Sequence, residues 1–115
     1  MIKVTYTYDR DKRECSLLVK GHAGQAEIGK DIVCASASIL AYTIAQVVKL
    51  MERHGDLVES PTLDLEGGDA TIVCRAKDDD LFAEIMQDFF VVRTGYTLLA
   101  HNYPEYVQII TDGEA

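Results

Sequence analysis

Residues 21–38 read Gly-His-Ala-Gly-Gln-Ala-Glu-Ile-Gly-Lys-Asp-Ile-Val-Cys-Ala-Ser-Ala-Ser, and the rest of the chain is arranged around them. Neither a strand period nor a helix period is visible over residues 21–30, whereas a long apolar helical pattern follows Asp31. We therefore predict a strand end, a loop and a helix start. His22 and Cys34 would lie at the two ends of that loop.

The residues before this stretch predict two strands. Residues 2–8 and 14–20 alternate between apolar and polar side chains, and a charged turn over residues 9–13 separates them. Strand, short turn and strand indicate an antiparallel hairpin. Cys15 falls on the apolar side of the second strand, which is typical of a small buried hydrophobic residue.

The residues after the loop predict an amphipathic helix of about six turns. Asp31 is a favoured N-cap residue, so we expect the helix to begin there and to run to residue 54. Gly55 follows as a left-handed C-terminal cap.

The second half repeats this order. Residues 57–65 are extended, and Pro61 favours an edge strand or a strand that begins after it. A turn over residues 66–69 leads to a strand over 70–76, in which Cys74 is expected to be buried like Cys15. A helix over 81–96 and a strand over 106–111 complete the chain.

The acidic run at residues 78–80 has two interpretations. It could bind a metal or a basic partner, or it could cap the second helix and interact favourably with the helix dipole. The capping interpretation is favoured because the helical pattern starts directly after the run.

The element order β-β-α-β-β-α-β predicts an α+β fold with a two-layer α/β sandwich. Two helices on one face of a mostly antiparallel sheet is the economical packing for this order. At 115 residues we expect one domain, residues 1–115.

Charge and composition narrow the functional classes. The net charge of −8 and the absence of a basic run argue against direct binding of nucleic acid. The acidic surface either attracts a basic, flexible partner or only keeps the protein soluble. No apolar run is judged long enough to span a bilayer, and residues 1–5 do not resemble a secretion signal, so we expect a cytoplasmic protein without a membrane partner.

The three cysteines, Cys15, Cys34 and Cys74, predict reduced thiols. Their odd number and wide spacing argue against a disulfide framework or a structural zinc site. His54 and His101 offer no metal-binding spacing with the central stretch, so we expect no metal and no cofactor.

The central stretch can supply a nucleophile. A cysteine attacks as its thiolate, which a helix N-terminus or a neighbouring imidazole can stabilise. With Asp31 as the cap, Cys34 would be the third residue of the helix, and a tight return of the chain would place His22 beside it. Unpaired amides of the first turn could then stabilise an oxyanion.

Other residues of the stretch have open roles. Asp31 could cap the helix or orient His22 as the third member of a triad. Ser38 could hydrogen-bond the substrate or His22, or could be a small residue at a helix–sheet contact. The pair itself could also be an inert buried cysteine and a loop histidine.

The motif Gly21-His22-Ala23, a short loop, then Gly29-Lys30-Asp31-Ile32-Val33-Cys34-Ala35 and Ser38 resembles the signature of the ribosomal-processing cysteine protease family, Prp. Chain length, element order and acidity resemble that family over the whole chain. The resemblance implies a small homodimeric α/β sandwich in which Cys34 is the nucleophile and His22 the base. Asp31, Gly21 and Ser38 are motif positions, and Gly24 and Gly29 belong to a loop that is expected to order on substrate.

The resemblance also implies a function. Family members remove an N-terminal extension from a large-subunit ribosomal protein, and they cut after an aromatic pair and before a small residue. Where the family often has Cys-Ala-Ala-Val-Ser, this chain has Ser36 and Ala37 in the middle of the motif, which could alter packing or peptide preference. A non-enzymatic ribosome-associated factor and a thiol redox sensor on the same fold are the alternatives.

Overall fold

The computed structural model describes residues 1–21, 28–66 and 69–111, with the backbone alone at residues 28–31 and 111. The expected element order is confirmed. The elements are β1 (Ile2–Asp9), β2 (Glu14–Lys20), α1 (Ile28–Arg53), β3 (Thr62–Glu66), β4 (Asp69–Arg75), α2 (Asp79–Asn102) and β5 (Val107–Thr111).

The five strands form one sheet in the order β3-β4-β2-β1-β5. The β1–β2, β2–β4 and β3–β4 pairs are antiparallel, whereas β1 and β5 are parallel. The predicted α+β sandwich with a mostly antiparallel sheet is therefore confirmed. The β1–β2 hairpin pairs Asp9 with Glu14, as the alternation and the charged turn predicted.

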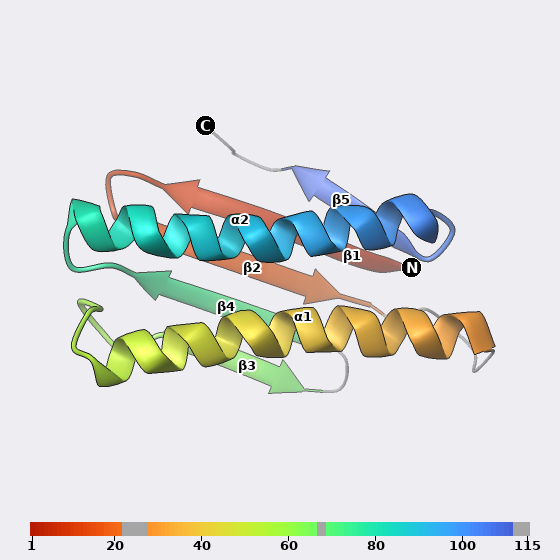
Figure 1. Cartoon of the computed structure of the whole chain (residues 1–115), viewed down its shortest axis with the longest axis horizontal. Helices are drawn as coiled ribbons and strands as arrows, with labels where there is room; N and C mark the ends of the chain where they lie inside the picture. The colour runs from red at the N-terminus through yellow and green to blue at the C-terminus, as the bar shows by residue number, and fades with distance from the viewer. Residues whose placement is uncertain (22–27, 67–68, 112–115) are drawn as a thin grey trace.

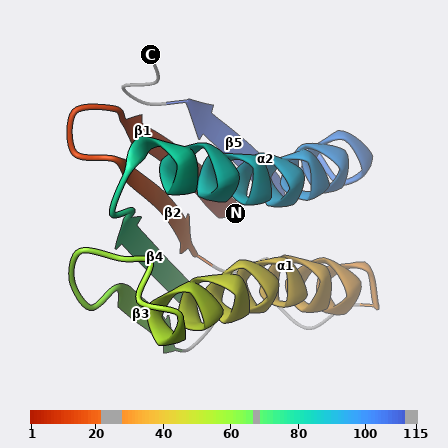
Figure 2. The ribbon, with the colours of Figure 1, turned by 60° about the vertical axis from the view of Figure 1, so that its left-hand side comes forward.

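Both helices cover the same face of the sheet and run in opposite directions (Figures 1 and 2). Each helix connects two strands that point the same way: α1 joins β2 to β3, and α2 joins β4 to β5. The α1 crossover passes over β4, so the beginning of α1 and the end of β2 lie near the same end of the sheet. This topology brings the end of β2 and the beginning of α1, the two elements joined by residues 21–27, close together.

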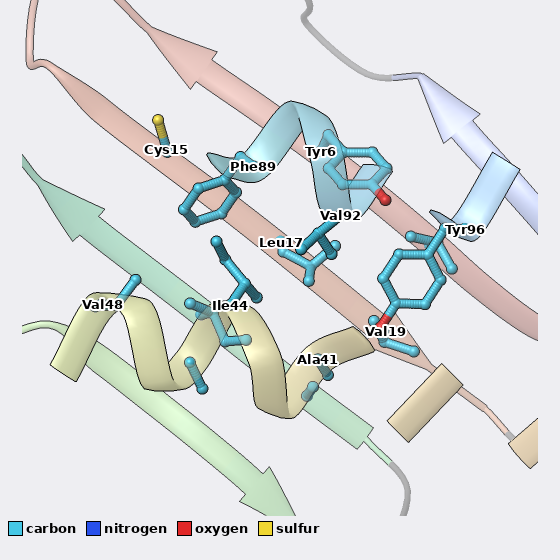
Figure 3. Close-up of a cluster of buried hydrophobic side chains, with 14 of the residues drawn as sticks. Tyr6, Cys15, Leu17, Val19, Ala41, Ile44, Val48, Phe89, Val92 and Tyr96 are labelled. Atoms are coloured by element: carbon cyan, nitrogen blue, oxygen red, sulfur yellow. The ribbon is translucent and has the colours of Figure 1, made fainter. Parts of the chain in front are cut away.

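The core fills the space between the helices and the sheet (Figure 3). Alternate residues of β1, β2 and β4 face the helices, and the apolar stripe of each helix faces the sheet. The largest fully buried side chains are Tyr96, Phe89, Leu17, Ile44, Ile72 and Ile85. Gly95 permits close contact between the helices, since a β-carbon there would lie 2.7 Å from Cδ2 of Leu40.

The first helix starts earlier than predicted. α1 begins at Ile28, so Asp31 is the fourth helical residue and the prediction that it is the N-cap is wrong. The reason is an ambiguity of the signal: acidic residues are favoured both at the cap and within the first turn, where they face the positive end of the helix dipole. Gly29 lies in the helix, which corrects its assignment to the loop.

The second helix is longer than predicted. α2 extends to Asn102, because Tyr96 and Leu99 continue the buried stripe beyond the expected end. Its start confirms the structural interpretation of the acidic run: the Asp78 carboxylate accepts a 2.9 Å hydrogen bond from the Leu81 amide, as an N-cap does. The neighbouring Asp79 accepts a 2.8 Å hydrogen bond from Arg13.

The described residues at two predicted turns agree with the prediction, whereas residues 67–68 inside the second turn lie outside the described residues. Gly55 has φ 74°, the left-handed conformation expected of a helix C-terminal cap. Strand β3 begins directly after Pro61, and Glu66 pairs with Asp69 across the β3–β4 hairpin.

One expectation about the membrane needs correction. Residues Ile32–Arg53 form a helix of 22 residues with mean hydropathy 1.6, long and apolar enough by length and composition alone to cross a bilayer. In the structure Val33, Ala41, Ile44 and Val48 of this helix are buried against the core, and a core helix passes the same test. Length and composition therefore do not exclude a span, contrary to the prediction, and the structure gives this apolar stripe a place in the core.

Candidate active site

The three thiols lie in different environments. Cys15 and Cys74 face each other as paired residues of β2 and β4, and their exposed fractions are 0% and 2%. Burial raises the pKa of the Cys15 thiol well above its usual range and that of Cys74 to about 12, so both thiols are neutral at neutral pH. Both are buried strand residues, as predicted. Cys34 is only partly buried and is therefore the accessible thiol of the three.

Cys34 borders a small cavity of about 40 Å³ between α1 and one end of the sheet. A space of this size holds a few water molecules and not a peptide residue. The cavity is lined by Ile2, Val19, Gly21, Cys34, Ala37, Ser38, Ala41, Tyr42, Leu65, Asp69 and Ala70.

Gly21 directly follows β2 in a conformation that requires glycine. Its φ of 98° lies in the left-handed region, and a β-carbon at this position would collide with the backbone carbonyl oxygen of Met1. Its amide donates a 3.0 Å hydrogen bond to Oδ1 of Asp69. The structure therefore explains this motif glycine physically: it redirects the chain at the end of β2, next to the cavity.

The helix residues around Cys34 have distinct roles. Ser38 follows one turn later and borders the same cavity, at a contact between α1 and the sheet. Ser36 does not need another partner, because its hydroxyl donates a 2.8 Å hydrogen bond to the Ile32 carbonyl within the helix. Ala37 is buried, and its carbonyl accepts a 2.7 Å hydrogen bond from the Tyr96 hydroxyl of α2.

The earlier helix start changes the expected chemistry at Cys34. Cys34 is the seventh residue of α1 and not the third. The first-turn amides, which end at Asp31, lie about 4.5 Å or more from Cys34 along the helix axis at a rise of about 1.5 Å per residue. The field of a helix end also falls off within one turn. The premise that Cys34 lies in the first turn is therefore wrong, and the expectation that backbone amides hold an oxyanion beside it stays a prediction.

Three predicted site features lie outside what the structure describes. His22 and Gly24 fall in residues 22–27, and only the backbone of Asp31 is described. The contact between His22 and Cys34, the mobility of the loop at Gly24 and the orienting role of the Asp31 side chain thus stay predictions, whereas the start of α1 at Ile28 rules out the N-cap role of Asp31.

Sequence reasoning missed Asp69 as a site residue. It was assigned only to the hairpin turn, yet it borders the same cavity as Cys34 and binds the residue before His22. Its separation of 48 residues from Gly21 leaves no local signal in the sequence. Among the described side chains, no group of three or more His, Cys, Asp or Glu residues could hold a metal ion.

Cys34 is an accessible cysteine on a helix beside one end of an α+β sheet. The fold and site therefore indicate the class of proteins that use a thiol nucleophile. The family model for cysteine protease Prp matches residues 1–108. The chain belongs to the Prp family of cysteine proteases.

Solved structures agree with this assignment. The crystal structure of SMU.848 from Streptococcus mutans has 29% sequence identity and a TM-score of 0.66, and the match covers 97% of this chain and 96% of that one. The S. aureus ribosomal processing protease Prp with a covalently linked product peptide has 25% identity and a TM-score of 0.66, with 97% and 100% covered. The same protease with a substrate peptide has 21% identity over the same coverage and a TM-score of 0.66, which supports the fold alone. A comparison with curated protein sequences finds no match.

Proposed function

We propose that this protein is a cysteine endopeptidase that removes the N-terminal extension of a large-subunit ribosomal protein, cutting after an aromatic pair and before a small residue. Membership of the Prp family supports the protease class. A relative described as a ribosomal processing protease, with a product peptide covalently attached, supports the substrate class and a covalent mechanism.

One observation carries the proposal for this chain's own residues. Cys34 is the accessible thiol of the three and borders a cavity that Gly21, the residue immediately before His22, also borders. The end of β2 and the second turn of α1 thus meet at one place. His22, the proposed base, is the next residue in the chain after Gly21.

The proposed reaction begins when His22 takes the proton of the Cys34 thiol. The sulfur attacks the scissile carbonyl carbon and forms a carbon–sulfur bond. When the tetrahedral intermediate collapses, the carbon–nitrogen bond breaks and the His22 imidazolium protonates the leaving amine. Water, deprotonated by His22, then attacks the thioester, which releases the carboxylic acid and regenerates the thiol.

Ser38 is the proposed polar contact to the substrate. It lies one turn beyond Cys34 on the wall of the same cavity, so its hydroxyl can donate to a peptide that crosses the mouth. The net charge of −8 further favours a basic peptide segment.

The proposal is tested with a peptide that carries an aromatic pair followed by a small residue. We expect wild type to cleave it after the pair, Cys34→Ala to be inactive, and His22→Ala to lose about 10²–10⁴-fold in kcat/KM. Ser38→Ala should be impaired, whereas Ser36→Ala is its matched control, because the Ser36 hydroxyl is bound within the helix. Equal cleavage by wild type and Cys34→Ala would end the proposal.

The two alternatives give different results in the same samples. A non-enzymatic factor would show no cleavage and the same alkylation of Cys34 at pH 6 as an ordinary thiol. A redox sensor would form a sulfenic acid at Cys34 whether or not His22 is present.

The proposal includes a cytoplasmic homodimer, as the family resemblance implies. Exposed apolar side chains on the helices, among them Ile39, Val91 and Leu98, are consistent with a further contact surface. Sedimentation analysis of the full chain at micromolar concentration measures this directly, and a monomer throughout would remove that part of the proposal.

A further inference from the structure

We propose that Asp69 is a positioning residue for the active site: it binds the Gly21 amide and thereby sets the point from which the chain leads to His22. This inference rests on the proposed function, because it concerns how the base of that reaction is held. Asp69 does not need to touch the substrate for this role.

The hydrogen bond between Asp69 and Gly21 lies where the regular sheet stops. Strands β2 and β4 pair antiparallel up to Val19 and Ala70, which is the last pair at this end among the residues that the structure describes. One step further along, Oδ1 of Asp69 accepts the Gly21 amide at 3.0 Å in a partly buried position. A side chain of β4 therefore continues the connection to β2 by one more hydrogen bond, at the residue where the backbone turns.

Gly21 is constrained on its other side as well. Its positive φ and its close approach to the Met1 carbonyl leave little room for the backbone to shift in that direction. The Asp69 hydrogen bond fixes the opposite side, so Gly21 is held between Met1, just before β1, and Asp69, the first residue of β4. Release of one of these two constraints lets the start of the following segment move.

The position of Asp69 links this constraint to Cys34. Asp69, Gly21 and Cys34 border one cavity, so a displacement at Gly21 occurs at the cavity that Cys34 also borders. A misplacement of reacting groups of about 1 Å can lower a rate by about 10²-fold. A group that holds the segment before the base is therefore expected to affect the chemical step more than peptide binding.

Two variants separate the hydrogen bond from the charge. Asp69→Ala removes the acceptor, whereas Asp69→Asn removes the charge and retains a carbonyl oxygen that can accept from the Gly21 amide. Thr71→Val is the matched control on the same strand, because it removes the neighbouring 3.2 Å hydrogen bond from Nζ of Lys20 and leaves Gly21 untouched.

We expect Asp69→Ala to lower kcat by about tenfold or more with KM changed less than about threefold. Its profile of Cys34 alkylation against pH should move toward that of His22→Ala. Asp69→Asn and Thr71→Val should stay within about threefold of wild type in kcat and keep the wild-type profile. A purely structural role would lower the thermal midpoint of Asp69→Ala without moving the alkylation profile of the fraction that remains folded.

If Asp69→Ala does not fold, hydrogen exchange of wild type decides the question, since the Gly21 amide must then be protected against exchange. Free exchange of that amide overturns the inference, as does an Asp69→Ala enzyme with wild-type kcat and pH profile, or an Asp69→Asn enzyme as impaired as Asp69→Ala. Wild type and His22→Ala with identical profiles and no cleavage would instead reject the proposed function itself. The two failures are thus distinguishable.

Discussion

The Tyr96 hydroxyl donates a 2.7 Å hydrogen bond to the carbonyl oxygen of Ala37, and both residues are buried (Figure 3 shows Tyr96 within the core cluster). This bond joins α2 to α1 one turn after Cys34. It fixes the candidate nucleophile's helix against the second helix, at a position where the Tyr96 ring also meets the Tyr6 ring edge-on at 6.4 Å between centroids.

Removal of this hydroxyl should destabilise the protein without changing its shape. We expect Tyr96→Phe to lower the free energy of unfolding by about 1 kcal/mol, the usual net contribution of such a hydrogen bond. Tyr42→Phe is the control, because Tyr42 is 52% exposed and its hydroxyl should be dispensable for stability. Denaturant unfolding measures both; equal stability of Tyr96→Phe and wild type would show that the bond contributes nothing.

The two described glycines with positive φ should differ in their tolerance of alanine. Both substitutions strain the backbone by about 1 kcal/mol. At Gly55 a β-carbon would meet no atom within 4 Å, whereas at Gly21 it would collide with the Met1 carbonyl. Thermal unfolding should therefore show a larger loss for Gly21→Ala than for Gly55→Ala, and only Gly21→Ala should impair cleavage. The reverse order would contradict the observed close contact.

Thiol reactivity should follow exposure. In native protein at neutral pH, iodoacetamide should modify Cys34, while Cys15 and Cys74 should react only after unfolding, because they are buried and their pKa values are raised. Mass spectrometry of the alkylated protein identifies the sites. Cys34→Ala should take up no label under native conditions, and rapid labelling of that variant would show that a strand thiol is accessible.

Stability should decrease in alkaline solution. The folded pKa of Cys74 is raised by burial to about 12, above an unfolded value of about 8.5. Its contribution is therefore fully present below about pH 8.5 and is lost as pH rises toward about 12, with about 2 kcal/mol lost by pH 10.

The same reasoning applies to the Cys15 thiol, whose pKa is also raised by burial. In a Cys34→Ala background, urea unfolding at pH 7 and pH 10 measures the loss, and a further Cys74→Ala substitution should reduce the difference by about 2 kcal/mol. An unchanged difference would mean that Cys74 ionises as readily in the folded protein as in the unfolded one.

Much of the fold could be predicted because its signals are local. Alternation placed β1 and β2, the apolar stripe placed both helices, and Asp78 and Gly55 marked helix ends through backbone groups close to them in the chain. The start of α1 could not be predicted this way. Asp31 gives the same favourable interaction at a cap as inside the first turn, so the sequence alone did not distinguish a helix that begins at Asp31 from one that begins at Ile28.

The residue types and spacing of the motif determined which thiol to consider and which fold class carries it. Only the tertiary structure decided that Cys15 and Cys74 are enclosed while Cys34 is accessible, and that Asp69 reaches Gly21 across 48 residues of chain. The physical reason is that burial and long-range hydrogen bonds depend on how the strands are ordered and how α1 crosses the sheet. A strand order of β3-β4-β2-β1-β5 brings the start of β4 to the end of β2, and no local pattern in the sequence encodes that neighbourhood.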